Sequence, residues 1–310
     1  MVYITLSSWN DYPHNIVSSP KSKSFSEDRS IKTGLPNYNL QHAISWEPMR
    51  PELRHPLHHT RRHASLARSI RLLRSFDYEQ SQPRKFYEPL ARDTAQQLAA
   101  IHQDVHGTGL DKLSVLDVGG GPGYFSAAFA EHGAHYIGLE PDVSEMTAAG
   151  ITLDTAVRAS GTALPFRDNS VDIVYSSNVA EHIKNPWDMA EEMVRVARNL
   201  AVMSYTVWLG PFGGHETGLW PHYIGGDFAR RRYERKHGHP PKNIWGHSLF
   251  DVSAREGLHW AAECGYRTYC FPRYHPSWAW WINSVPGLRE LGTSNLVIVV
   301  DKTRNKLRLK

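Results

Sequence analysis

The chain has 310 residues, of which 41% are hydrophobic, and it carries a formal net charge of +4 with a sequence pI of about 9.0. This length suits one α/β domain with additions or two small domains, and the hydrophobic content excludes global disorder. The chain has two cysteines, Cys264 and Cys270. Two cysteines exclude a disulfide framework and a cysteine-rich zinc site, so we expect reduced thiols.

The N-terminal residues carry no basic stretch followed by a sustained apolar run, so we expect no signal peptide. The densest apolar cluster elsewhere, Trp278–Ile282, is too short to cross a bilayer. We therefore expect a cytoplasmic protein whose contact with a membrane, if it has one, is peripheral.

Residues 1–59 are rich in Ser, Pro, Asn, His and Lys and show no hydrophobic periodicity. Such a composition cannot bury enough apolar surface to offset the entropy of ordering, so we predict a disordered extension. Met49 stands just before the composition changes. One hypothesis is that translation starts there and that residues 1–48 are absent from the native protein, which mass spectrometry of the N-terminus would test.

Residues 60–106 are predicted to form a helical N-terminal segment. Within residues 60–76, Leu66, Ile70 and Leu73 share one helical face, and five arginines surround them. A basic amphipathic helix of this kind indicates an anionic membrane surface or a partner, and the alternative is a helix packed on its own domain with solvated arginines. A second helix is expected over residues 84–103, with Phe86, Leu90, Thr94 and Leu98 on one face.

From residue 113 the pattern alternates between strand and helix. Strands separated by helices indicate a parallel sheet covered on both faces, so we predict an α/β domain over residues 107–310 with a doubly wound, mostly parallel, seven-stranded sheet. Residues 208–265, rich in aromatic residues, His and Gly, are predicted to be a substrate-side insertion after strand five. The expected strands are residues 113–118, 135–140, 154–160, 171–177, 200–207, 267–271 and 295–300, and the expected helices between them are residues 124–132, 143–150 and 187–198.

The first strand ends in a glycine-rich turn, Asp117–Gly123, in which Gly119, Gly121 and Gly123 follow a G-x-G-x-G spacing. Glycines let a ligand approach the backbone, and in open α/β sheets the ligand crevice lies at the carboxyl ends of the strands. The third glycine of the dinucleotide fingerprint is absent. Glu140 ends the next strand, where a carboxylate accepts hydrogen bonds from both ribose hydroxyls of a nucleoside. These residues favour a nucleoside cofactor, and the alternative is a tight structural turn.

The segments VLDVGGGPGYF, GLEPD and GTALPFRDNSVDIVYSSNVAEHI occur in an order and spacing that resemble the class I methyltransferases, which have a Rossmann-like fold and use S-adenosyl-L-methionine. The resemblance covers roughly residues 110–207. The segments YTVWLGPFGGHETGLWPHY and FPRYHPSWAWW resemble uncharacterised actinobacterial, mycobacterial-type members of the type 11 methyltransferase-domain family. The resemblance implies S-adenosylmethionine as the cofactor and methyl transfer as the activity.

The resemblance also assigns roles to the residues of the predicted cofactor site. Asp117 is expected to hold the turn and the cofactor's amino group, and Glu140 is expected to bind the ribose hydroxyls. The backbone of the turn is expected to approach the methionine part and the ribose. The remaining predicted cofactor contacts are Gly119, Gly121, Gly123, Gly161, Thr162, Ala163 and Asn178.

Two positions depart from the pattern of this family. Ser160 stands where many relatives have an acidic residue, so adenine is expected to contact the backbone of the following loop rather than a carboxylate. Relatives also carry a Pro-Gly-Gly turn before strand five, whereas this chain has the shorter run Val196–Ala201. We expect either an early end to the preceding helix or a less well formed fifth strand.

Three residues are candidate catalytic groups on the acceptor side: His182, Tyr205 and His215. Methyl transfer depends largely on positioning and desolvation, and a general base is needed only when the acceptor carries a proton. The alternative role for His182 is to tie a loop together. Because His215, Glu216 and His222 lack the H-E-x-x-H spacing, no metal site is predicted. The segment Tyr274–Trp281 is expected to grip an apolar acceptor, rest at a membrane interface or pack in the core.

The sequence therefore favours a methyltransferase that acts on a small-molecule or lipid acceptor. One alternative is a non-catalytic nucleoside-binding protein that keeps the fold. A second is an NAD-dependent oxidoreductase, which the missing third glycine and the lack of a Tyr-x-x-x-Lys pair disfavour. No nucleic acid is expected as a partner, because the basic residues cluster in one N-terminal helix and no Asn-Pro-Pro-Tyr motif follows strand four. The oligomeric state is not predicted.

Overall fold

The computed structural model describes residues 57–75, 78, 82–151, 153 and 155–305. The hypothesis about Met49 and most of the predicted disordered extension lie outside these residues. At residues 57–59 that prediction is wrong, because Leu57 is buried and helix α2 (His58–His63) follows it directly. Asp104 of the neighbouring long helix accepts hydrogen bonds from the amides of His59 and Thr60 at 2.9 and 2.8 Å, which fixes the start of α2.

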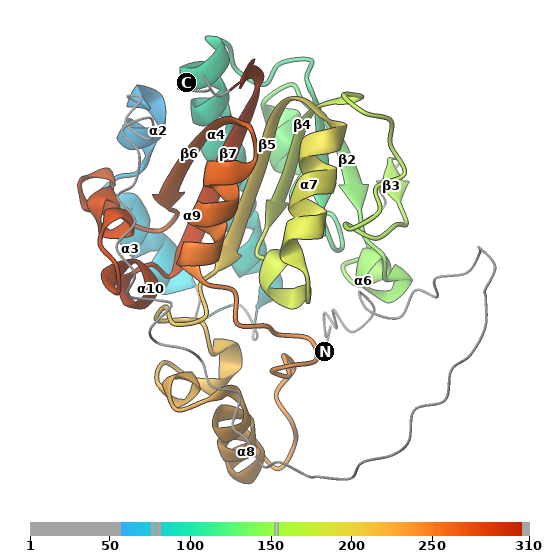
Figure 1. The fold of residues 1–310 in the computed structure, drawn as a ribbon. Helices are drawn as coiled ribbons and strands as arrows, with labels where there is room; N and C mark the ends of the chain where they lie inside the picture. Colours follow the sequence, from blue (N-terminus) through green and yellow to red (C-terminus); the bar gives the residue numbers. More distant parts are fainter. Residues whose placement is uncertain (1–56, 76–77, 79–81, 152, 154, 306–310) are drawn as a thin grey trace, which may run out of the picture.

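A seven-stranded sheet forms the centre of the molecule, with the order β3-β2-β1-β4-β5-β7-β6 (Figure 1). Strands β1 to β5 pair in parallel, and β7 runs antiparallel to both β5 and β6. The predicted mostly parallel, doubly wound sheet is confirmed. The strands are β1 (Ser114–Val118), β2 (His135–Leu139), β3 (Ala156–Val157), β4 (Val171–Ser177), β5 (Ala197–Thr206), β6 (Tyr266–Pro272) and β7 (Asn295–Asn305).

Helices cover both faces of this sheet because successive strand residues point to opposite sides. Val115 and Ile173 pack with residues of two helices on one face, whereas Leu116 and Val174 pack with residues of two helices on the other. The first face is covered by α4 (Pro83–His106) and α5 (Ser126–Glu131), and the second by α7 (Pro186–Val196) and α9 (Ala254–Glu263). The short helix α6 (Val143–Thr147) follows β2. None of the helices in the described part of the chain is long and apolar enough to cross a membrane.

The predicted single amphipathic helix over residues 60–76 is wrong in two respects. The chain breaks between α2 and α3 (Leu66–Ser75), and the residues of the predicted apolar face of α3 are exposed. The buried residues of α3 are Arg68, Ser69 and Leu72. Nε and Nη2 of Arg68 donate to the two carboxylate oxygens of Asp93 on α4 at 2.6 and 2.7 Å. Burial alone would raise the pKa of Asp93, but the hydrogen bonds from His63 and Arg68 outweigh it and hold this pKa well below its usual range. The ion pair therefore sets the rotation of α3.

The short connection before strand five ends α7 early and leaves the strand intact. Helix α7 stops at Val196 and β5 begins at the next residue, Ala197. The amides of Asn169 and Ser170 donate to the last carbonyls of the helix region at 2.9 and 3.0 Å, so the preceding loop takes the place of a glycine turn. Strand β5 then pairs along its length with β4 and β7.

The segment after β5 is shorter as an insertion than predicted. It contains η4 (His215–Thr217), η5 (Pro221–Tyr223) and α8 (Gly226–His237), and it lies beyond the edge of the sheet from which α6 also emerges (Figure 1). Helix α9 instead covers the sheet and contacts β6 and β7, so the insertion ends before Ala254 rather than at residue 265. After β6, the chain continues into η6 (Ser277–Ser284) and α10 (Leu288–Gly292) at the same edge.

Candidate active site

The glycine-rich turn is tied to the end of β2 and leaves one glycine facing open space. The amides of Gly119 and Gly120 both donate to the carbonyl of Leu139, at 2.8 and 3.1 Å. A Cβ atom on Gly119 would lie 2.4 Å from the Val179 side chain, and φ there is +82°. Gly121 has φ +50°, and an added Cβ would meet no atom of the described chain within 4 Å. Gly119 is therefore required by packing, whereas Gly121 presents its backbone where a ligand can approach.

Gly123 is required by packing in the same way as Gly119. Its φ is +82°, and an added Cβ would lie 2.5 Å from the side chain of Leu153. Leu153 precedes β3 in the chain, so the end of the turn packs against the segment that leads to the third strand. A side chain at position 123 would separate these two segments.

Two buried carboxyl groups flank the turn. Asp117, at the end of β1, and Glu140, just after β2, are each 2% exposed. The Glu140 carboxylate accepts hydrogen bonds from the amides of Gly121 and Asp142, both at 3.2 Å, and Asp117 accepts one from the Tyr136 hydroxyl at 2.7 Å. Burial raises the pKa of each group to about 7, against the opposing effect of these donors. A carboxylate has about four lone-pair positions, so Glu140 retains acceptors for two ribose hydroxyls, and the residues present fit S-adenosylmethionine.

The predicted adenine loop follows β3. Gly161 is buried, Thr162 is half-buried and Ala163 is exposed. The Ser160 hydroxyl lies 2.9 Å from the Thr162 hydroxyl and accepts a hydrogen bond from the Thr162 amide at 3.3 Å. Ser160 therefore stabilises its own turn, in keeping with a loop that offers adenine its backbone.

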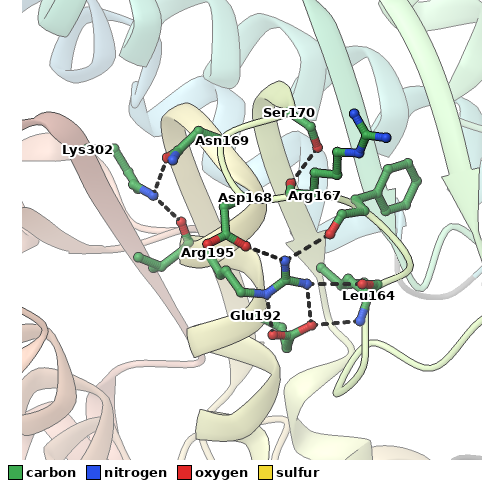
Figure 2. Close-up of polar contacts among 10 residues, drawn as sticks. Leu164, Arg167, Asp168, Asn169, Ser170, Glu192, Arg195 and Lys302 are labelled. Atoms are coloured by element: carbon green, nitrogen blue, oxygen red, sulfur yellow. Dashed lines mark hydrogen bonds and ion pairs between the residues drawn. The ribbon is translucent and has the colours of Figure 1, made fainter.

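One arginine of α7 anchors the residues that follow this loop (Figure 2). Arg195 donates to Glu192 and Asp168 and to the carbonyls of Leu164 and Phe166, at 2.6 to 3.0 Å. Glu192 also accepts a hydrogen bond from the Leu164 amide at 2.8 Å. The surface cavity beside this network, bordered by Trp260 and Lys302 among others, lies where β4 begins and thus at the edge opposite the glycine turn. The network therefore holds the residues that follow the loop, at the edge of the sheet away from the glycine turn.

The end of β4 leads directly to the acceptor side. Asn178 has φ +57°, its amide donates to the Ser204 carbonyl at 2.8 Å, and its side-chain oxygen accepts from Asn295 at 2.6 Å. The next turn, η3 (Ala180–His182), places His182 near His215 of the insertion, with ring centroids 5.2 Å apart. The structure therefore brings together two of the three candidate catalytic residues, although they are far apart in the sequence.

Tyr205, the third candidate, lies in the core. It is fully buried, and its hydroxyl donates to the Ser253 carbonyl at 2.8 Å. An added Cβ on Gly257 of α9 would lie 2.1 Å from this hydroxyl. Because neighbours on a strand alternate, Ser204 faces α4 while Tyr205 faces α9. The contacts give Tyr205 a structural role, and we do not retain it as a catalytic candidate.

Arg273 is a residue of this region that the sequence patterns did not reveal. It follows β6 and is 1% exposed, and its guanidinium donates to the hydroxyls of Ser177, Ser204 and Thr94 at 2.5 to 2.9 Å. It thus joins the carboxyl ends of β4 and β5 to α4. The signal in the sequence was a single cation inside the apolar segment FPRYHPSWAWW, and its three partners come from other segments.

Comparison with known proteins shows the family. A family model described as "Methyltransferase domain" matches residues 116–203. An "Uncharacterized methyltransferase" of Mycobacterium avium is 59% identical over 245 residues, which cover 77% of this chain and 96% of that protein. A protein of the same description from Mycobacteroides abscessus is 58% identical over 246 residues, which cover 76% of this chain and 95% of that protein.

Solved structures are more distant in sequence. A putative S-adenosyl-L-methionine-dependent methyltransferase of Methanococcus maripaludis has 14% identity and a TM-score of 0.43, covering 78% of this chain and 95% of its own. Geranyl diphosphate methyltransferase, in complex with GPP and sinefungin, has 16% identity and a TM-score of 0.42, covering 68% of this chain and 77% of its own. On the family match and the relatives that it covers nearly end to end, the chain belongs to the S-adenosylmethionine-dependent methyltransferases.

Proposed function

We propose that this methyltransferase acts on a lipid acceptor at a membrane surface, with a water-soluble small molecule as the alternative. The observation that supports the proposal is a set of large apolar side chains left exposed beside the site. We name them the apolar surface. Its members are Leu66, Ile70, Leu73, Trp278, Trp281, Leu288 and Leu291, each at least 41% exposed.

Hydrogen bonds join the elements that carry this surface. The amide of Ser277 on η6 donates to the carbonyl of Ala64, between α2 and α3, at 2.8 Å. Arg68 of α3 donates to the Arg273 carbonyl, just before η6, also at 2.8 Å. Helix α10 packs on η6. Large apolar side chains exposed on adjoining elements are typical of a binding surface, and tryptophan is typical of membrane interfaces.

Positive charge borders the apolar surface. Arg61, Arg62, Arg71 and Arg74 on α2 and α3 are exposed, whereas Arg68 is committed to Asp93. Each exposed arginine close to an anionic bilayer contributes about 1 kcal/mol of attraction. The combination of exposed tryptophan, leucine and arginine supports an anionic lipid surface as the partner.

The apolar surface lies beside the predicted acceptor site. Strand β6 runs in the same direction as β5, so its carboxyl end lies at the edge of the glycine turn. Arg273, the residue after β6, donates to Ser177 of β4 and Ser204 of β5. A lipid headgroup held at this edge would lie at the same edge of the sheet as His182 and His215 while its chains stay in the bilayer.

The roles of the site residues follow from this placement. Asp117, Glu140 and the backbones of the turn and the adenine loop are the predicted ligands of S-adenosylmethionine, which when bound supplies a methyl group from its sulfonium. His182 and His215 are the predicted catalytic residues on the acceptor side. Positioning and exclusion of water at this edge are the contributions expected from the insertion.

Incubation of the purified enzyme with methyl-labelled S-adenosylmethionine and a total cell extract tests the proposal. After phase separation, we expect label in the lipid fraction, and its loss in His215→Asn. Label confined to the water-soluble fraction would overturn the lipid acceptor in favour of a small molecule. Intact cofactor binding without label in any fraction would instead favour the non-catalytic alternative.

A further inference from the structure

Three side chains from two distant segments converge beside the end of β4. Glu181 and His182 belong to η3, and His215 begins η4 in the insertion. One potential ligand atom from each side chain lies within 4.8 Å of the other two. We propose that Glu181, His182 and His215 form a zinc site with one coordination position left open.

The donor set suits this ion. Two histidines and one glutamate are the protein ligands of several catalytic zinc sites, in which a water or the substrate takes the fourth position. Zinc holds nitrogen and oxygen ligands at about 2.1 Å, so ligand atoms in a tetrahedral site lie about 3.4 Å apart. In the cluster the ligand atoms lie within 4.8 Å of one another, so binding of the ion requires them to move closer together.

Backbone carbonyls orient both imidazoles for metal binding. Nδ1 of His182 lies 2.7 Å from the Ser248 carbonyl, and Nδ1 of His215 lies 3.3 Å from the Gly213 carbonyl. Because a carbonyl can only accept, Nδ1 carries the proton in each ring and Nε2 keeps its lone pair. Histidines that bind metals are held in this way by a hydrogen bond from their other ring nitrogen.

Glu181 supplies an independent observation. Its side chain is 1% exposed, and one carboxylate oxygen accepts a hydrogen bond from the Thr206 amide at 3.1 Å. The other oxygen, Oε2, has no hydrogen-bond partner among the residues that the structure describes. Burial removes the hydrogen bonds that a carboxylate oxygen makes to water. Without a donor from the protein, this costs free energy. A bound cation supplies the missing partner.

The backbone at His215 is also unusual. Its φ is +48°, in the left-handed region that residues with a Cβ rarely adopt and that recurs at functional sites. The neighbouring polar residues are committed elsewhere. Glu216 accepts hydrogen bonds from the amide and side chain of Asn243, and Nε2 of His222 lies 3.1 Å from the Gly210 carbonyl. The proposed ligands are therefore not the combination of His215, Glu216 and His222 considered in the sequence, for which no metal site was predicted.

The place of the cluster indicates what the ion does. It begins three residues after Asn178, on the acceptor side of the predicted cofactor site, and its role there rests on the proposed function. An acceptor oxygen in the open position would lose its proton more easily, since zinc lowers the pKa of bound water from about 15.7 to about 7. The proton passes to solvent, and the oxygen that remains is the nucleophile.

Metal uptake by the full-length protein tests the site without reference to activity. Protein freed of metal with a chelator is titrated with Zn²⁺ and, separately, with Co²⁺. We expect one equivalent of each to bind, visible d–d absorption typical of tetrahedral Co²⁺, and a higher melting temperature with Zn²⁺. His215→Asn and Glu181→Gln should each weaken binding by more than about 100-fold. Asparagine tolerates a left-handed backbone, and glutamine still accepts from Thr206.

The control addresses adventitious binding at the surface. His259 and Glu263 form an exposed pair on α9, 3.3 Å apart, which resembles a weak metal site. His259→Asn should leave zinc affinity and stoichiometry unchanged. Three results would each overturn the site: absence of tight uptake by the wild type, uptake by both cluster variants equal to that of the wild type, or loss of uptake in His259→Asn.

Cofactor titration of every variant shows whether it is folded. If His215→Asn does not bind S-adenosylmethionine, Glu181→Gln carries the test. Methyl transfer that persists in zinc-free protein would reject the activating role of the ion and leave the lipid proposal intact. Zinc binding without label in the lipid fraction would reject the lipid acceptor and leave the zinc site intact.

Discussion

Glu140 is the predicted cofactor ligand whose charge we expect to matter most for binding. Burial raises its pKa to about 7, so near neutral pH the ligand-free protein holds this carboxyl partly protonated. Only the ionised form accepts hydrogen bonds from both ribose hydroxyls, and those bonds lower the pKa in the complex. We therefore expect cofactor binding below pH 7 to release a proton, and cofactor affinity to depend on pH.

We expect the affinity for S-adenosylmethionine to rise as pH increases to about 7 and then to level off. Below pH 7 this group contributes at most about a tenfold loss for each pH unit. Glu140→Gln should bind about 10- to 100-fold more weakly, since charge-assisted hydrogen bonds contribute about 1.5–3 kcal/mol. Its pH profile should be flatter, with a remaining slope from Asp117, whose pKa is also raised to about 7. Calorimetric titration from pH 5.5 to 8.5 measures both quantities.

The raised pKa of Glu140 also affects the stability of the ligand-free protein. Stability falls as pH rises, whereas cofactor affinity rises. A carboxyl whose pKa rises on folding stabilises the folded state at pH values below its unfolded pKa, and this contribution is lost as pH rises through about 7. The melting temperature of Glu140→Gln should thus lie close to that of the wild type at pH 5 and above it at pH 8. Glu88→Gln, at an exposed position on α4, is the control and should change neither profile. A steep affinity profile in Glu140→Gln would show that another group titrates.

At the scale of secondary-structure elements, α7 does more than cover the sheet. Arg195, near its C-terminal end, uses its planar guanidinium to hold Leu164, Phe166 and Asp168 at the same time (Figure 2). A lysine has one ammonium group and cannot reproduce this fork. The helix therefore determines the shape of the loop that is predicted to contact adenine.

Arg195→Lys should weaken cofactor binding several-fold while costing only about 1 kcal/mol of stability, because the side chain is 32% exposed and solvent screens its charges. Arg84→Lys is the matched control. Its arginine pairs with Glu88 at 3.6 Å, both ends are exposed, and the change should affect neither property. Calorimetric titration and thermal melting provide the two measurements. Unchanged cofactor affinity in Arg195→Lys would show that the loop holds its shape without α7.

Helix α3 shows how tertiary contacts override a local pattern. Its sequence repeats apolar residues on one side, yet Arg68 is drawn inward by Asp93 and the apolar side faces outward. Deleting the segment would break this buried ion pair and disturb α4 as well. Point substitutions on the exposed side are therefore the appropriate probes of the apolar surface.

For the molecule as a whole, the predicted cofactor residues, the proposed zinc ligands and the apolar surface lie at one edge of the sheet. We expect the protein to float with anionic vesicles and much less with zwitterionic ones. Binding should weaken as salt rises from 0.05 to 0.5 M, roughly the range in which the Debye length falls from about 14 to about 4 Å. A variant with Trp278→Ser and Trp281→Ser should lose most of the binding, because each tryptophan removes a large apolar contact from the membrane interface.

Trp220→Ser supplies the comparison for this experiment. Trp220 is 48% exposed on the insertion, stacks with Arg232 and lies outside the apolar surface as defined here. Its replacement should leave flotation unchanged. If it abolishes flotation while the double variant still floats, the insertion rather than the apolar surface contacts the membrane.

The sequence by itself determined the order of strands and helices, the glycine turn and its acidic partner. Each is a short-range feature, because strand and helix periods repeat over a few residues and the turn and Glu140 end adjacent strands. Even the shortened connection before β5 could be interpreted, since it allowed the early end of α7 that the structure shows.

Tertiary structure alone decided the rest, since those features depend on contacts between distant segments. Tyr205 points into the core because side chains alternate along β5. Its hydroxyl donates to the Ser253 carbonyl at the start of α9, which packs on that face of the sheet. Arg273 lies among hydroxyls from three other segments. Glu181 and His182 lie near His215 only because the insertion folds back over the end of β4. The two segments are too far apart in the sequence for a spacing rule to relate them.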